Sequence, residues 1–415
     1  MQASTVTAAF LAALVVTTAL RAWLALRQMR HVAARRDTVP AEFAAVIAPA
    51  DHARAADYTV AKARLFLAEL AADTGLLLLL TLGGLLQHID ARLVALLDGR
   101  GHLHGLALFA CFGIAGFLAG LPFSLYRTFV LEARFGFNRT TPALFVSDIV
   151  KQALLAVAIG APVLFVVLWL MDAMGALWWL HVWLFWLGFN LLMLLLYPTV
   201  IAPLFNKFAP LEDAAMKTRI EALLARCGFH ASGLFVMDGS RRSAHGNAYF
   251  TGFGKSRRIV FFDTLLEKLS PPEVEAVLAH ELGHFKHRHV WKRIGLLAGA
   301  SLVLLWLLGL LIHEPAFFQG LGVAEAGTAM ALILFSLVLP LFTFPLAPLT
   351  SRLSRSHEFE ADAYAARHTA ANELIGALVK LYRDNAATLT PDPLHSLFHD
   401  SHPPAAIRIA RLQGR

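Results

Sequence analysis

Two histidines and a glutamate stand close together in the stretch His280-Glu281-Leu282-Gly283-His284. On a helix, residues four apart lie on the same face, so both imidazoles can reach one Zn²⁺ at about 2.0–2.1 Å. Glu281 projects beside them, at the distance that a water on the metal needs. Zinc polarises a carbonyl and acidifies water, and the glutamate acts as general base. The motif therefore predicts metal-assisted hydrolysis, with a structural or incidental histidine pair as the alternative.

A catalytic zinc needs a third protein ligand and an open position, and an acidic stretch near the C-terminus offers that ligand. Glu358 and Asp362 are four residues apart in a segment that is expected to be helical, so they share a face. We expect Glu358 to bind the zinc, one ion per chain, and Asp362 to accept the free ring N–H of a ligating histidine. Glu360 points elsewhere and is expected to be a surface charge. The alternative is an exposed acidic face beside Arg355.

The segment from Ser270 to Glu273 marks the start of the helix that carries the two histidines. Serine suits the N-cap, proline suits the first helical position, and a glutamate three residues after the cap closes a capping box. The same helix is expected to continue through His287 and His289. One helix cannot easily surround an ion with three side chains, and neighbouring Lys and Arg residues mark a basic end near lipid headgroups. We therefore expect His287 and His289 to be solvated.

Extended segments are predicted before this helix, at 233–237, 244–250 and 258–262, with a turn at Gly252 to Lys255. They would form a small sheet with a hairpin. A strand edge near a zinc site can hold an extended peptide by backbone hydrogen bonds. Asn247 would then lie where its amide can bind a substrate carbonyl, although asparagine in a strand is more often a bulge or turn residue.

The rest of the chain is more apolar than soluble enzymes are. Of its 415 residues, 57% are hydrophobic and only 16% are charged, which excludes disorder, a coiled coil and an ordinary soluble enzyme. Runs of about twenty apolar residues recur, and a helix of that length crosses the ~30 Å hydrocarbon core of a bilayer. Seven membrane-spanning helices are predicted, near residues 5–26, 65–87, 103–125, 153–172, 176–198, 294–312 and 328–349.

The charges of the loops predict the orientation, because Lys and Arg stay on the cytoplasmic side of short loops. The loops after the first and third spans are rich in these residues, whereas the loops after the fourth and sixth contain none. The N-terminus is therefore expected outside, with the 199–293 insertion and the 350–415 tail inside. The chain has a formal net charge of +7, and its basic residues lie in a few loops between the apolar segments. This distribution favours membrane lipid over nucleic acid as a partner.

Ionisable residues inside the second predicted span are unfavourable unless they face protein or water. These residues are Glu69 and Asp73. One interpretation is a hydrated interior lined by the two carboxylates. The other is that both lie at a helix end near the cytoplasmic headgroups.

Motifs spread over most of the chain resemble those of one family. The matching stretches are Leu196–Leu211, Asp238–Phe253, Arg258–Leu266, His280–His284, Ser354–Ala363, and Ser401–Pro404 followed by Arg408, with Phe135–Asn138 fitting as well. The sequence is thereby similar to the integral-membrane zinc CAAX prenyl proteases, the type that processes yeast mating pheromone and prelamin. Gly246 departs from the pattern, since many relatives have serine before the asparagine.

The resemblance implies a mainly α polytopic membrane protein whose seven helices enclose a hydrated chamber, closed at the cytoplasmic end by a small α+β zinc-protease domain. By motif position, the zinc ligands are His280, His284 and Glu358, and Glu281 is the general base. His402 matches a histidine that stabilises the oxyanion, and Arg408 matches an arginine close to the active site. Without the resemblance, His402 would be one of several histidines in the tail.

Four segments are expected from these observations. Residues 1–198 hold the first five spans, 199–293 the sheet and the zinc-motif helix, 294–349 the last two spans, and 350–415 the tail that completes the zinc site.

The predicted function is hydrolysis of a peptide bond near the C-terminus of a lipidated or otherwise membrane-delivered peptide or protein. A general quality-control protease of membrane proteins would use the same residues and stays open. A seven-helix transporter or channel with a structural zinc is a further alternative, although a structural site has no use for Glu281 beside the metal. The richness in Ala, Leu and Arg favours a bacterial inner membrane over the endoplasmic reticulum.

Overall fold

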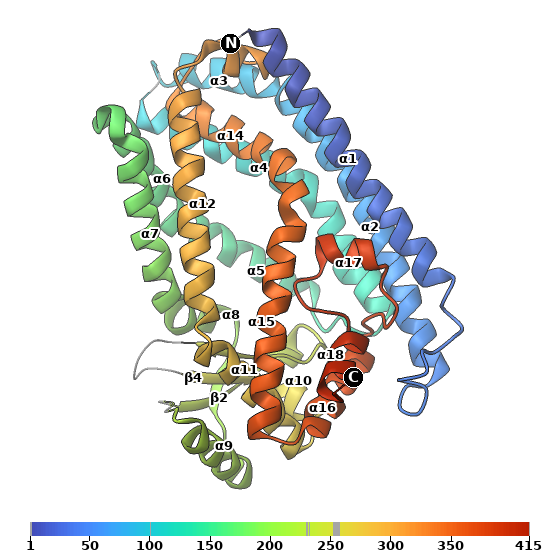
Figure 1. Cartoon of the computed structure of the whole chain (residues 1–415). Coiled ribbons are helices and arrows are strands. Elements are labelled where there is room, and N and C mark those ends of the chain that lie inside the picture. The colour runs from blue at the N-terminus through green and yellow to red at the C-terminus, as the bar shows by residue number, and fades with distance from the viewer. Residues whose placement is uncertain (1, 100, 230, 232, 252–257, 415) are drawn as a thin grey trace.

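The computed structural model describes residues 2–99, 101–229, 231, 233–251 and 258–414. Long helices form most of the molecule, and a small sheet with short helices lies at one end of them (Figure 1). The N-terminus lies at the opposite end from this sheet. The mainly α fold with a small α+β part is as the sequence predicts.

The first half of the chain is helical throughout. Its helices are α1 (Ala3–Ala33), α2 (Pro49–Leu80), α3 (Leu85–Leu96), α4 (His102–Tyr126), α5 (Pro142–Leu155), α6 (Ala161–Ala173), α7 (Trp178–Leu196) and α8 (Ala202–Phe205). π-Helical turns at Arg127–Glu132, Ala156–Gly160 and Tyr197–Ile201 extend α4, join α5 to α6, and join α7 to α8. Such turns keep a helix continuous while shifting the face that its next residues present.

The second half contains the sheet and the remaining helices. The strands are β1 (Phe208–Pro210), β2 (Gly233–Met237), β3 (Ala248–Thr251) and β4 (Arg258–Phe262). The helices are α9 (Ala214–Cys227), α10 (Asp263–Leu266), α11 (Pro271–Lys286), α12 (His289–Leu311), α13 (Pro315–Gly320), α14 (Thr328–Thr343), α15 (Ala347–His368), α16 (Ala371–Asp384), α17 (Pro393–His399) and α18 (Ala405–Leu412). Short 3₁₀ turns lie at Gly175–Leu177, Gly239–Arg241 and Phe344–Leu346.

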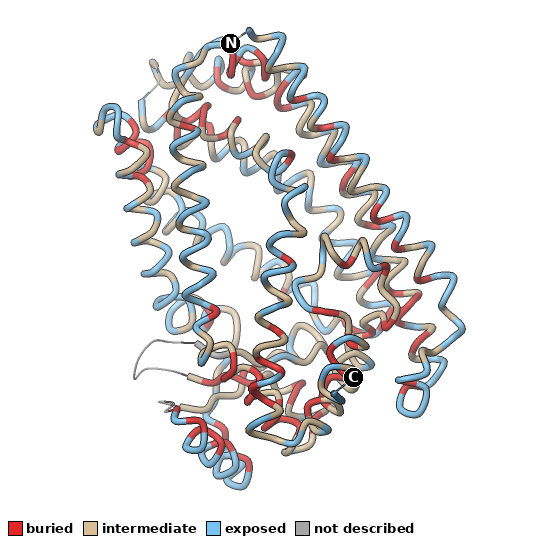
Figure 2. Tube along the Cα trace, in the orientation of Figure 1, coloured by how far each residue is buried: buried red, intermediate tan, exposed pale blue. Residues whose placement is uncertain are grey.

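The membrane helices agree with the seven predicted spans. Within the described ranges, six continuous helical runs are long and apolar enough to cross a bilayer, and α2 with α3, bent by 49°, makes a seventh if counted as one span. Their most apolar windows are little buried, for example 6% in the α4 run, 0% in the α7 run and 6% in α12. Figure 2 shows buried residues at the two ends of the molecule and along α1, whereas the middle parts of α7 and α12 are exposed or half-buried. This low burial is compatible with the expected chamber, which stays a prediction.

The loops that join the helices lie at two opposite ends of the molecule, which is the arrangement that the loop charges predict. At the end near the N-terminus, Thr7 donates to the carbonyl of Gly320 at 2.7 Å, which joins the start of α1 to α13. At the other end, the N–H of Arg139, in the loop after the third span, donates to the carbonyl of Arg242 at 3.1 Å. The predicted cytoplasmic loop after the third span therefore contacts the part of the chain that holds the sheet.

Glu69 in α2 is partnered within the protein. Its carboxylate accepts from Arg127 Nη2 at 2.5 and 2.8 Å, so the charge is paired across two helices. Asp73, one turn further along α2, is exposed. Both interpretations of these carboxylates stay predictions.

The sheet is mixed, with the order β1-β2-β4-β3. β2 and β4 are parallel, and β3 is antiparallel to β4 with Ala248 opposite Phe261. β2, β3 and β4 lie where extended segments are expected, except that β3 begins later than residue 244, while β1 is an addition. The turn predicted at Gly252 to Lys255 lies outside the described residues. In the part of the chain that is described, β3 is an edge strand.

The zinc-motif helix α11 begins as its sequence predicts. Ser270 and Glu273 form a reciprocal capping box, and Glu273 Oε2 accepts the N–H of Ser270 at 2.7 Å. Lys380 of α16 donates to the same oxygen at 2.6 Å, which ties the helix start to the tail. The helix does not continue as expected, because it ends at Lys286 and α12 starts at His289. Arg288 between them adopts the left-handed conformation, with φ 55° and ψ 35°.

α15 runs on from the last membrane helix. A 3₁₀ turn at Phe344–Leu346 joins α14 to α15, so Thr328–His368 is one helical run. α15 therefore crosses the segment boundary expected between residues 349 and 350.

α11 and α15 pack against each other at Gly283. A Cβ added at Gly283 would lie 2.8 Å from Ala361 Cα and 3.1 Å from the Ala361 carbonyl oxygen. Ala361 is fully buried, and Tyr364 Cβ would be 3.1 Å away on the same side. The backbones of the two helices therefore meet with no side chain between them.

We predict that Gly283→Ala destabilises the protein and weakens metal binding, because the new methyl group must push α15 away from α11. Overpacking of this kind costs about 1–3 kcal/mol. The thermal unfolding midpoint and the bound zinc should both fall. Gly295→Ala in α12 is the matched control, because no atom lies within 4 Å of its added Cβ. Equal behaviour of the two variants would contradict this packing constraint.

We predict that Ala326→Cys reacts with an impermeant thiol reagent in intact cells, whereas Gln413→Cys reacts only after permeabilisation. Both residues are exposed, and they lie at opposite ends of the helices. The expectation rests on the charge bias of the loops. The chain with only its native cysteines gives the background. Labelling of Gln413→Cys from outside would invert the orientation.

Candidate active site

The two histidines of the zinc motif and Glu358 converge where α11 meets α15. His280 Nε2 lies 3.2 Å from His284 Nε2. The carboxylate oxygens of Glu358 lie 3.5 Å from the first nitrogen and 3.4 Å from the second. Donor atoms about 2 Å from a tetrahedral ion lie roughly 3.3 Å from one another, so this spacing fits one small cation.

The electrostatics of this cluster favour a positive charge at its centre. Burial disfavours a charged His280 imidazole, but the adjacent carboxylates of Asp362 and Glu358 outweigh this effect and raise the pKa of His280 to about 9. Burial and the charge of His280 lower the pKa of His284 to about 3. Glu358 Oε2 is buried and, among the described residues, has no hydrogen-bond partner. Two facing imidazole nitrogens and this oxygen form a donor set that fits a divalent zinc ion.

Asp362 and Arg408 hold the ring of His280 from behind. Asp362 Oδ1 lies 2.9 Å from His280 Nδ1, so the ring N–H donates to the carboxylate and Nε2 is the atom available to a metal ion. Arg408 donates to both oxygens of Asp362, from Nη2 at 2.6 Å and from Nε at 2.9 Å. All three side chains are buried. Arg408 therefore acts on the cluster through Asp362, and also directly, since its Nη1 lies 3.7 Å from Glu358 Oε2.

Glu281 follows His280 directly and is half-buried. Burial raises the pKa of its carboxyl group. The negative charge of Glu358 also raises this pKa, whereas the positive charge of His280 lowers it by less than burial raises it. A raised pKa suits a carboxylate that must accept and return a proton near neutral pH.

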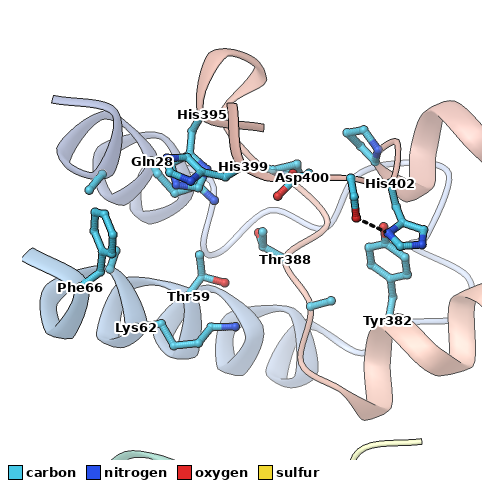
Figure 3. Close-up of a pocket in the computed structure, with 16 residues that line it drawn as sticks. Gln28, Thr59, Lys62, Phe66, Tyr382, Thr388, His395, His399, Asp400 and His402 are labelled. Atoms are coloured by element: carbon cyan, nitrogen blue, oxygen red, sulfur yellow. Dashed lines mark hydrogen bonds between the residues drawn. The ribbon is translucent and has the colours of Figure 1, made fainter. Parts of the chain in front are cut away.

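His402 reaches the cluster from the tail. Its Nε2 lies 3.4 Å from Glu358 Oε1, although 60% of the side chain is exposed. Its Nδ1 hydrogen-bonds with Ser401 Oγ at 2.9 Å, shown as the dashed line in Figure 3. The ring thus stands beside the Glu358 carboxylate and remains accessible.

A cavity of about 500 Å³ adjoins His402, between α1, α2 and the tail. Figure 3 shows His402 with Tyr382 at one end of it, and Phe66 at the other end near His395 and His399. Burial lowers the pKa of both of these histidines to about 4, so they are neutral at physiological pH. The cavity is therefore mostly uncharged, apart from Lys62 and Asp400.

Asn247 stands just before the edge strand β3. It is exposed, and its Oδ1 accepts the N–H of Ala248 at 2.8 Å. Within the described ranges, no hydrogen bond or ion pair joins Asn247 to His280, His284 or Glu358.

One expectation about neighbouring residues is wrong, and a second is incomplete. His289 is not solvated: its side chain is only 5% exposed, and its Nδ1 lies 2.9 Å from His284 Nδ1. Glu360 is more than a surface charge, because its Oε2 lies 3.0 Å from His289 Nε2. His287 is half-buried, with its Nδ1 3.6 Å from Glu360 Oε2.

Sequence reasoning missed His289 because its five-residue spacing from His284 does not put the two on one helical face. The contact depends on the left-handed backbone of Arg288. An arginine does not indicate that conformation, so the sequence offers no signal for it. The cavity was missed as well, because its walls come from segments that are more than 300 residues apart.

Comparisons with known proteins agree with this geometry. Residues 28–207 match the family described as CAAX prenyl protease N-terminal, five membrane helices, and residues 210–415 match peptidase family M48. The CAAX prenyl protease 1 homolog of Oryza sativa subsp. japonica is 38% identical over 315 residues, which are 75% of this chain and 73% of that protein. The CAAX prenyl protease 1 of Saccharomyces cerevisiae is 37% identical over 313 residues, 71% of this chain and 69% of that protein.

A solved structure extends the likeness to the fold. The crystal structure of S. mikatae Ste24p matches with a TM-score of 0.90 and 30% identity, and the match covers 99% of each chain. The chain therefore belongs to the membrane-embedded CAAX prenyl proteases of peptidase family M48, and it is a metalloprotease.

Proposed function

We propose that this chain binds one zinc ion through His280, His284 and Glu358 and hydrolyses a peptide bond near the C-terminus of a prenylated protein or peptide. The observation that carries the proposal is the convergence of these three side chains, with Glu281 next to them, in a chain of this family. When bound there, zinc supplies Lewis-acid chemistry, polarising a peptide carbonyl and acidifying water.

Glu281 is the general base of the proposed reaction. It takes a proton from the attacking water and later gives that proton to the leaving amine. Its half-buried position and raised pKa support this role, because the carboxyl group must be able to hold the proton between the two steps.

Asp362 and Arg408 fix the reactive geometry. The carboxylate keeps the N–H of His280 on Nδ1, which directs Nε2 to the metal. Arg408 keeps the buried carboxylate in place and offsets its charge. We assign both as positioning residues, since neither needs to touch the peptide.

His402 is proposed to donate to the oxygen that becomes negative when the carbonyl is attacked. Support comes from the accessible ring and its place between Glu358 and the cavity. The cavity would hold residues on one side of the scissile bond. The edge of β3 would hold the peptide in an extended form, with Asn247 at its start.

The substrate class and the compartment are proposals. Relatives in rice and yeast bear the name CAAX prenyl protease 1, which supports a prenylated substrate. The loop charges support catalysis on the cytoplasmic side, in a protein whose apolar helices contact lipid. A bacterial inner membrane stays a prediction from composition alone.

We predict that Glu281→Gln retains zinc and fold but loses turnover, because the amide keeps the shape of the side chain and cannot accept the proton. The loss should be about 10³-fold or more. Turnover of a farnesylated peptide and zinc content by metal analysis are measured on the same preparation. Near-normal turnover with one zinc per chain would contradict the proposed role of Glu281.

We predict that a farnesylated C-terminal peptide is cleaved with a kcat/KM roughly tenfold or more above that of the same unmodified peptide, because the lipid holds it at the membrane near the site. The purified protein in vesicles is given each peptide separately, and Glu281→Gln supplies the background. Equal cleavage of both peptides would contradict the preference for prenyl groups and favour the quality-control alternative.

A further inference from the structure

The break between α11 and α12 brings His289 back to the zinc motif. In an uninterrupted helix, a residue five positions on lies about 140° around the axis, so it would not meet His284. The left-handed conformation of Arg288 redirects the chain after Lys286. As a result His289 Nδ1 lies 2.9 Å from His284 Nδ1, the ring nitrogen that faces away from the ligand cluster.

His289 is held tightly in this position. Its side chain is 5% exposed, and its ring stacks on that of His357 at 4.0 Å with an interplanar angle of 13°. Its other nitrogen, Nε2, lies 3.0 Å from Glu360 Oε2. The three side chains of His284, His289 and Glu360 thus form a linear chain of hydrogen bonds from α11 across α12 to α15.

One arrangement of protons satisfies this chain when His284 binds a metal through Nε2. A neutral imidazole carries a single N–H, so that of His284 must be on Nδ1. It donates to His289 Nδ1, which must then be the unprotonated nitrogen. The proton of His289 lies on Nε2 and is donated to the carboxylate of Glu360.

We propose that His289 and Glu360 are positioning residues for the zinc ligand His284, as Asp362 and Arg408 are for His280. The inference rests on the zinc site proposed above. The relay fixes the tautomer and the ring orientation of His284 and raises the basicity of its Nε2. Each zinc-binding histidine is thus oriented by a carboxylate, directly in one case and through a second imidazole in the other.

If Glu360 had a purely structural role, its substitution would have a different effect on zinc binding. Lys292 Nζ lies 3.7 Å from Glu360 Oε2, so the carboxylate also forms an ion pair that ties α15 to α12. If that tie were its whole contribution, removing Lys292 would have the same effect as removing Glu360. The two residues can therefore be separated by substitution.

The test measures the zinc dissociation constant of the full-length purified protein by titrating the metal-free form with zinc against a competing chelator. His289→Leu should bind zinc about 10–100-fold more weakly, and Glu360→Ala about tenfold more weakly. His289→Asn and Glu360→Gln should recover most of the affinity, because each keeps an acceptor oxygen in the relay. Lys292→Ala should bind zinc like the unmodified protein. Glu358→Ala, which loses a direct ligand, sets the lower limit of affinity.

The thermal midpoint of each metal-free variant separates positioning from folding. The inference requires that His289→Leu and His289→Asn have similar midpoints in the metal-free form while differing in zinc affinity. Unchanged affinity in His289→Leu, or equal losses in Glu360→Ala and Lys292→Ala, would overturn it. Those outcomes leave the proposed function intact if the unmodified protein binds zinc and Glu358→Ala does not. Absence of zinc binding by the unmodified protein would instead refute the proposed function.

Discussion

The close approach of α11 and α15 is the contact on which the rest of the site depends. Gly283 and Ala361 let the two backbones touch, and Gly283 lies between the motif histidines in the sequence. A methyl group at that point would separate the helices by an appreciable fraction of a metal–ligand bond, which is about 2 Å long. The surrounding core of α9, α10, α16 and the sheet holds this contact from outside, with residues such as Ile220, Phe261 and Leu374 nearly fully buried. The three proposed metal ligands are therefore positioned by helix packing and need no loop to bring them together.

The second constraint is the amount of charge that the site buries. Glu358 and Asp362 are nearly inaccessible, and Glu281 lies beside them. Unpaired carboxylates in such surroundings would be strongly unfavourable. Arg408 and a divalent cation together carry as much positive charge as these three carboxylates carry negative charge. The arginine thus does more than orient Asp362, since it makes the whole cluster electrically neutral when the metal is present.

The parts of this structure that the sequence predicted are those in which a local pattern determines the outcome. Apolar runs predicted the membrane helices, the Ser270 to Glu273 pattern predicted the start of α11, and the spacing of Glu358 and Asp362 predicted that both would face one way. What was missed depends on contacts between distant segments. The hydrogen bonds of Arg408 to Asp362 depend on where the tail folds back, and the burial of His289 depends on the backbone angle of one neighbouring residue. The contact of Glu360 with His289 of α12 likewise cannot be read from its position in an acidic stretch.

The continuity of α14 with α15, together with the short step from α11 to α12, leaves no linker between the bilayer and the chemistry. Any fragment that contains both ligand helices also contains α12 and α14, whose most apolar windows are only 6% and 33% buried. A water-soluble catalytic domain cannot be cut from this chain. Since a helix is stiff along its axis, a change in the tilt of the continuous α14–α15 run would move Glu358 relative to the histidines of α11. We therefore expect bilayer thickness and lateral pressure to affect the rate of hydrolysis, in the way that temperature and pH do for a soluble peptidase.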